Sequence, residues 1–177
     1  MDLNEATLAH LEALRADTRD EIKRRIQQRD QYSMQLTVAL GATVVGAFSA
    51  NGTYRLFTLA PLVAIYFTAL ILFSYRIHDV LAKYLREQIE PEFEKACGVP
   101  KAMEWESWYK ASDLKVGIRR EFFVWEMWAV TLLSMAFVWY KDWSRGQGCA
   151  IFIALGFATA IYLVLTLWVM SLLRRRN

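Results

Sequence analysis

The sequence predicts an all-α membrane protein with four transmembrane helices and helical cytoplasmic extensions. Two observations predict this fold class. Of the 177 residues, 55% are hydrophobic, which is more than a soluble chain usually carries. These residues are gathered into blocks almost free of charge, and the blocks alternate with segments dense in charge. Each apolar block has close to the roughly 20 residues that a helix needs to cross about 30 Å of hydrocarbon.

Four apolar blocks are the expected spans. They cover residues 32–50, 56–77, 122–140 and 149–173. The alternative is a soluble protein with buried helices, but four such lengths in one small chain disfavour it. Aromatic residues, which favour membrane interfaces, stand near the ends of these blocks.

The distribution of Lys and Arg predicts the orientation. The N-terminal segment, the stretch from Arg76 to Arg120 and the C-terminal tail together hold eighteen of them. The two short loops on the other side hold only Arg55, Lys141 and Arg145. Because cytoplasmic loops are enriched in Lys and Arg, both termini are expected in the cytoplasm, as in a membrane protein of the inner-membrane type.

This orientation divides the chain into five parts. They are a cytoplasmic amphipathic helix (1–31), a first transmembrane hairpin (32–77), a cytoplasmic helical region (78–121), a second transmembrane hairpin (122–173) and a basic cytoplasmic tail (174–177).

Two of the spans are expected to continue into the cytoplasm as helices. The N-terminal segment carries an apolar stripe at helical spacing, made of Leu8, Leu11, Leu14, Thr18, Ile22 and Ile26. No Gly or Pro precedes Gly41, so this helix should run into the first span. The second span should extend similarly, with a kink or restart at Pro91 and a stop at residues 97–100. Ser112 or Asp113 would cap a further helix.

No catalytic arrangement is visible. The chain has no nucleotide-binding glycine loop, no Cys-x-x-Cys pair, no HExxH and no serine elbow. His78 and Asp79 are the one neighbouring histidine and acid, without further ligands at fixed spacing. We therefore expect no enzyme, no catalytic residue, no metal and no cofactor.

Glu126 is the one acid inside an apolar block. It lies about five residues inside the third block, where an ionisable group tends to face a bundle interior or a water-filled path. The alternative is that it stays in the headgroup zone beside Arg119 or Arg120. Together with Thr131 and Ser134, it forms our candidate set of pore residues.

Basic and aromatic residues interleave in the cytoplasmic parts. The candidate ligand-binding residues are Trp105, Trp108, Lys110, Lys115, Arg119, Arg120, Arg24 and Arg25. Such a mixture can bind phosphates and stack bases, and it can equally hold the headgroups of anionic membrane lipid. Residues 78–121 contain nine acids against eight Lys and Arg, which weakens the nucleic-acid interpretation.

Small residues recur at a spacing of four, as Ala42, Gly46 and Ala50 and as Ala150, Ala154 and Ala158. They predict close helix contacts, either within the chain or between copies of a homo-oligomer.

The runs at residues 77–79, 84–91 and 105–106 look like a group of uncharacterised bacterial membrane proteins. The plan of residues 1–96 (a basic N-terminal helix, a tight two-span hairpin and a cytoplasmic helical extension) resembles the SLATT class of small membrane effectors. It is also similar to the Hailong-type effectors of bacterial anti-phage defence. The resemblance implies a pore that depolarises the infected cell under control of a nucleotide or oligonucleotide made by a partner nucleotidyltransferase. The second pair of spans departs from the two-span SLATT plan, so no pore position is carried over.

Two functions remain open at this stage. The first is an oligomeric channel or pore-forming effector gated by a ligand on its cytoplasmic helices. The second is a non-conducting membrane scaffold or regulatory subunit that binds a cytoplasmic protein through the same helices.

Overall fold

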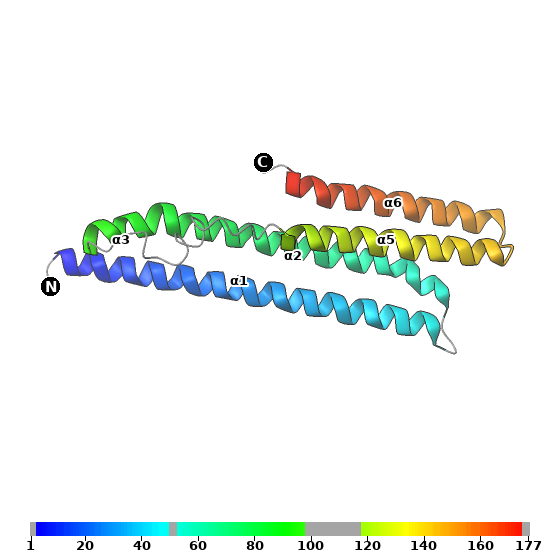
Figure 1. Cartoon of the computed structure of the whole chain (residues 1–177), viewed down its shortest axis with the longest axis horizontal. Coiled ribbons are helices and arrows are strands. Elements are labelled where there is room, and N and C mark those ends of the chain that lie inside the picture. The colour runs from blue at the N-terminus through cyan, green and yellow to red at the C-terminus, as the bar shows by residue number, and fades with distance from the viewer. Residues whose placement is uncertain (1–2, 50–52, 98–117, 175–177) are drawn as a thin grey trace. The chain divides into compact units, whose positions relative to one another are not determined.

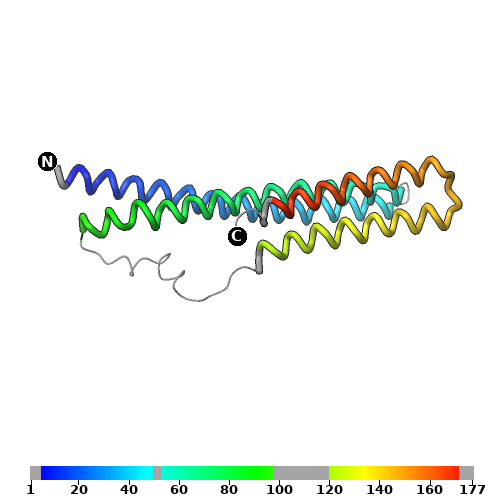
Figure 2. The backbone as a smooth tube through the Cα atoms, turned by 90° about the horizontal axis from the view of Figure 1, so that it is seen from above, coloured from blue at the N-terminus to red at the C-terminus, as the bar shows by residue number. Residues whose placement is uncertain are grey.

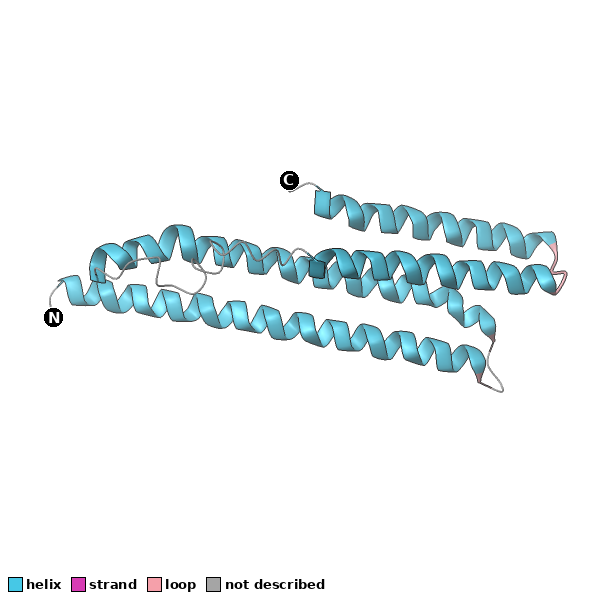
Figure 3. Cartoon of the chain, in the orientation of Figure 1, coloured by secondary structure: helices cyan, strands magenta, loops and turns pink. Residues whose placement is uncertain are grey.

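A computed structural model describes residues 3–49, 53–97 and 118–174, and helices make up nearly all of these residues (Figure 3). The elements are α1 (Leu3–Phe48), the 3-10 helix η1 (Tyr54–Leu59), α2 (Ala60–Tyr84), the π-helix η2 (Leu85–Ile89), α3 (Glu90–Cys97), α5 (Ile118–Ser144) and α6 (Cys149–Arg174). The described part of the chain therefore confirms the all-helical prediction.

Helix α1 is unbroken over 46 residues, from the charged N-terminal segment into the first apolar block (Figure 1). The predicted continuity is confirmed, since nothing before Gly41 removes a backbone donor or favours a turn. At helical rise this element is about 69 Å long.

The second long helical path runs from α2 through η2 to α3, and its π-helix ends at Ile89, two residues before Pro91. Proline lacks an N–H and its ring crowds the carbonyl four residues earlier, here that of Glu87. The π-turn widens the backbone at this point, and the N–H of Glu90 bonds to the carbonyl of Leu85. The predicted kink or restart is thus a π-turn without a break in the helical path. The predicted stop after Cys97 and the predicted cap at Ser112 or Asp113 lie outside the described residues.

The chain forms two compact units. One, here called the charged unit, comprises residues 1–30 and 73–116, and the other, the apolar unit, comprises residues 31–72 and 117–177. These divisions fall close to the changes in charge along the sequence at residues 31, 77 and 121. The assignment of the charged unit to the cytoplasm and of the apolar unit to the membrane stays a prediction.

In the charged unit, the apolar stripe of α1 packs against α2 and η2 of the same chain. The buried residues of this contact are Ile22 of α1 and Leu85 and Ile89 of η2, with Leu14, Ile26 and Leu81 packed around them. The Ser74 hydroxyl donates to the backbone carbonyl of Arg25 at 2.9 Å.

Two cation–π contacts accompany this packing. The Arg29 guanidinium lies 4.5 Å from the centroid of the Tyr75 ring, and the Arg15 guanidinium lies 4.8 Å from that of Phe93. The stripe therefore has its partner within the chain.

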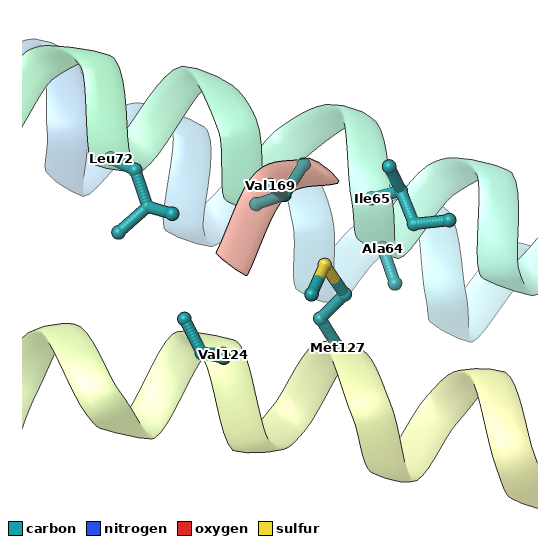
Figure 4. Close-up of a cluster of buried hydrophobic side chains, with 6 residues drawn as sticks. All are labelled: Ala64, Ile65, Leu72, Val124, Met127 and Val169. Atoms are coloured by element: carbon teal, nitrogen blue, oxygen red, sulfur yellow. The ribbon is translucent and has the colours of Figure 1, made fainter. Parts of the chain in front are cut away.

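In the apolar unit, α2, α5 and α6 share a core. Figure 4 shows this cluster, in which Met127 of α5 points toward residues of α2 and α6. Its buried residues are Ala64, Ile65, Leu72, Val124, Met127 and Val169. A second cluster joins α5 to α6 around Met135, Val138 and Leu155. Phe48 of α1, Phe57 of η1 and Phe137 of α5 contact one another in pairs, with ring centroids 5.2–6.0 Å apart.

Three helical segments of the described chain are long and apolar enough to cross a membrane. They are Tyr54–Cys97, Arg120–Ser144 and Cys149–Ser171. Helix α1 is not among them, because Gln31, Ser33 and Gln35 lower the mean hydropathy of its apolar half. The structure thus supports a membrane protein with three such segments, and the span in α1 stays a prediction.

The small residues of α1 do not form one surface. A Cβ added at Gly46 would lie 3.3 Å from Cδ1 of Leu56, so Gly46 faces η1 of the same chain. Ala42 is exposed, and Ala50 lies outside the described residues. In α6, Ala150 and Ala154 are exposed, whereas Ala158 packs against the second cluster.

Candidate functional site

Glu126 of α5 is half-buried and has no hydrogen bond or ion pair with any other described residue. Its neighbour Trp125 is exposed. The alternative of a pair with Arg119 stays a prediction, because the side chain of Arg119 lies outside the described residues. Glu126 is therefore a carboxylate in an apolar helix without a neutralising partner in the described part of the chain.

Thr131 and Ser134, the other two candidate pore residues, are buried inside the chain. The Ser134 hydroxyl donates to the carbonyl of Val130 at 2.6 Å, with a longer contact to the carbonyl of Thr131 at 3.3 Å. At 100° per residue, Thr131 points about 140° away from Glu126 around the helix axis. By the same measure Ser134 lies about 60° from Thr131 and about 80° from Glu126. The structure therefore buries Thr131 and Ser134 inside the chain, whereas Glu126 is only half-buried.

Sequence reasoning missed Asp142, which is fully buried at the end of α5. Its Oδ1 accepts hydrogen bonds from the Tyr54 hydroxyl and from the Arg55 guanidinium, the latter at 3.1 Å. Arg145 makes a cation–π contact with Tyr54, and its guanidinium lies 4.6 Å from the centroid of the Tyr54 ring. We call Tyr54, Arg55, Asp142 and Arg145 the clasp, because they join η1 to α5.

Local structure fixes the position of Asp142. The turn between α5 and α6 (Figure 2) closes with Gly146 at a positive φ of 60°, a conformation that glycine adopts without steric cost. The backbone N–H of Gln147 bonds to the carbonyl of Asp142 at 3.2 Å. Oδ2 of Asp142 is buried without a hydrogen-bond partner among the described residues.

A signal for Asp142 was present in the sequence. It is the one acid in residues 51–55 and 141–148, where Arg55, Lys141 and Arg145 are the cations. The orientation is predicted from Lys and Arg alone, and such a count does not include Asp142.

Two further hydrogen bonds hold the same part of the apolar unit. The Tyr162 hydroxyl of α6 donates to the carbonyl of Thr58 at 2.7 Å. The Trp139 indole N–H of α5 donates to the Thr159 hydroxyl of α6 at 3.1 Å. Side chains of η1, α5 and α6 are thus linked by polar contacts between residues far apart in the chain.

The candidate ligand-binding residues are only partly within the described chain. Trp105, Trp108, Lys110 and Lys115 lie outside it, as does the side chain of Arg119. Arg120 is half-buried, and Arg24 is exposed.

Arg25 is already engaged within α1. Its Nε donates to Glu21 at 2.7 Å and its Nη1 to the side-chain oxygen of Gln28 at 3.1 Å. Because Arg25 is neutralised locally, Arg24 is the better available cation of the two.

No group of three or more metal-ligating side chains occurs in residues 3–49, 53–97 and 118–174. His78 contacts its neighbour Asp79, with Nδ1 3.7 Å from Oδ1.

Comparison of the chain with protein-family models, with curated proteins and with solved structures gave no match.

Proposed function

We propose that the chain is the subunit of an oligomeric ion channel in the inner membrane of a bacterium, controlled by its charged unit. In this proposal, the apolar unit crosses the membrane four times, with α1 as the first span and both termini in the cytoplasm. The resemblance to SLATT and Hailong-type proteins makes anti-phage defence its setting.

The observation that carries the proposal is the continuity of two helical paths. Helix α1 and helix α2 each pass from a charged half into an apolar half without interruption, and the π-turn η2 lies beyond the charged end of α2. A helix resists bending unless a proline, a glycine pair or a π-turn interrupts its hydrogen bonds. A displacement of the charged halves is therefore transmitted along the backbone to the apolar halves. A passive anchor has no need of two such connections.

Ion flux tests conduction and the role of Glu126. The purified protein, reconstituted in liposomes with and without ligand, is expected to pass cations, because a carboxylate in an apolar path attracts them. Glu126→Gln is expected to lower the preference for cations over anions by about tenfold. The measurement is the reversal potential in planar bilayers under a salt gradient.

Glu121→Gln is the matched control, since Glu121 is exposed on the same helix five residues earlier and its removal should leave the reversal potential unchanged. Protein that never passes ions under any condition would sink the channel proposal.

The proposed ligand is a nucleotide or oligonucleotide made by a partner nucleotidyltransferase. Reversing Lys115, Arg119 and Arg120 to Glu is expected to weaken its binding at least by about 100-fold, because three phosphate contacts are lost. Isothermal titration with linear and cyclic oligoadenylates measures the change. Lys95→Glu is the control, since Lys95 is exposed and pairs with Glu92. Unchanged binding in the triple variant would remove this site from the proposal.

A second candidate function is a non-conducting scaffold or regulatory subunit that binds a cytoplasmic protein. One observation favours it: Thr131 and Ser134 face the interior of the chain, so α5 offers no polar row to an ion. A stable complex with a protein partner, together with absent flux and a dispensable Glu126, would establish this alternative.

A further inference from the structure

The apolar half of α1 has one face that no other part of the apolar unit covers. Between residues 31 and 48 its buried residues are Leu36 and Ala47, and they lie on one side of the helix. The opposite side is exposed and repeats every three or four residues. Thr37, Val44 and Phe48 form one edge of this exposed side, and its remaining residues are here called the α1 face: Gln31, Met34, Gln35, Val38, Gly41, Ala42 and Val45.

The α1 face differs from the exposed face of α6 in its polarity. The exposed residues of α6 between Ala150 and Trp168 are all apolar, as lipid requires. They are Ala150, Ile153, Ala154, Phe157, Ala160, Ile161, Val164, Leu167 and Trp168. The α1 face instead carries two glutamines, each with a side-chain amide that has two donors and an acceptor.

The glutamine amides find no partner nearby. The hydroxyls of Thr37 and Thr43 bond to the carbonyls of Ser33 and Ala39 in their own helix, at 3.1 and 2.8 Å. The side chains of Gln31 and Gln35 form no hydrogen bond with any described residue. An amide that faces hydrocarbon would be unsatisfied, so these side chains require water or the polar groups of another chain.

Gln35 lies inside the apolar block of α1. The block begins at residue 32, three residues before Gln35. Phe48 of α1 contacts Phe57 of η1, which places these two residues at the same height along the two helices. Thirteen residues from Phe48 and from Phe57 lie Gln35 and Leu70, and the second apolar block continues from Leu70 to Ile77. Gln35 therefore lies about 5–10 Å inside the apolar layer.

The centre of the α1 face consists of small and apolar residues. Val38 and Val45 flank Gly41 and Ala42, and a Cβ added at Gly41 would meet nothing within 4 Å. Small residues let neighbouring helices approach closely. Where several copies of this helix surround a path, Val38 and Val45 would form an apolar constriction next to the glutamines. Such a constriction closes to water and ions by dewetting.

We infer that the α1 faces of several copies of this chain surround the ion path, with Gln35 lining its wet part and Val38 and Val45 its constriction. The inference rests on the proposed conduction and identifies the helix that performs it. It also assigns a direct mechanical role to α1, since the charged half of this helix and the wall of the path are one element.

Thiol labelling tests the inference. The background variant has Cys97→Ser and Cys149→Ser, because both native thiols are exposed. Single variants Gln35→Cys, Val38→Cys and Val45→Cys are reconstituted and treated with a charged, membrane-impermeant methanethiosulfonate. We expect modification at Gln35→Cys under all conditions, modification at the valines only when ligand opens the path, and a fall in flux of about tenfold on modification.

The matched controls are Val164→Cys and Phe157→Cys on α6. Val164 and Phe157 are 65% and 70% exposed, close to the 66% of Val38 and 70% of Val45, and they belong to the all-apolar exposed face of α6, which is expected to face lipid. They should not react with the charged reagent.

The outcomes separate this inference from the proposed function. Flux that falls when the control cysteines are modified, but not when the α1 cysteines are modified, would overturn the inference and leave conduction intact. Absence of flux in the parent protein, with selective labelling of Gln35→Cys, would overturn conduction while the α1 face remained the water-facing one. Equal labelling of the α1 and control positions would overturn the inference whatever the flux.

Discussion

Replacing Asp142 with alanine is expected to destabilise the apolar unit by about 2–3 kcal/mol, because the change removes a buried acceptor of two hydrogen bonds. The Tyr54 hydroxyl would lose its partner in a half-buried position, and η1 would lose its polar link to α5. Thermal unfolding in detergent, followed by tryptophan fluorescence, measures the effect.

The control separates the effect of removing a buried carboxylate from the effect of removing any carboxylate. Asp17→Ala removes an exposed carboxylate from α1, and its effect should stay within about 0.5 kcal/mol. Arg55→Gln should also destabilise the apolar unit, because the Asp142 carboxylate is fully buried and loses its cation. An unfolding temperature of Asp142→Ala equal to that of Asp17→Ala would show that the clasp does not hold η1.

Replacing Ile22 with aspartate is expected to cost more than about 3 kcal/mol, because it places a charge among Leu85, Ile89 and their neighbours. The α1 segment of the charged unit should then detach from η2 and exchange its backbone amides rapidly. Hydrogen–deuterium exchange of the peptide covering residues 14–29 measures the loss. In the proposed channel, the same variant should lose the dependence of flux on ligand.

Gln27→Asp provides the comparison, since it introduces the same side chain at an exposed position of the same helix. Its amide exchange should remain that of the parent protein. Protection of residues 14–29 that survives Ile22→Asp would mean that α1 does not depend on this contact.

Features with a local cause could be predicted from the sequence. Continuity of α1 follows from the absence of Gly and Pro, and the irregularity at η2 follows from the missing N–H of Pro91. The spacing of Ile22 and its neighbours predicts a covered stripe. It could not say whether Leu85 of the same chain or another copy covers it, since periodicity carries no information about the partner.

The candidate site was harder to predict because polarity in an apolar helix has two explanations. Ser134 is polar, but it satisfies itself with the carbonyl of Val130 in its own helix, so its presence says nothing about water. Asp142 depends on a contact between residues 88 positions apart, which no local pattern encodes. Gln35 stands out only once the structure shows that its face is uncovered and level with the apolar part of α2.

The clasp also imposes an order on biosynthesis. Tyr54 is made 88 residues before Asp142, an interval of about 4–18 s at ordinary rates of translation. During that time α1, η1 and α2 exist without α5, and the Arg55 cation has no counter-ion from Asp142. The clasp can therefore close only after α5 has left the ribosome, so the synthesis of α5 is the event that completes the polar contacts of η1.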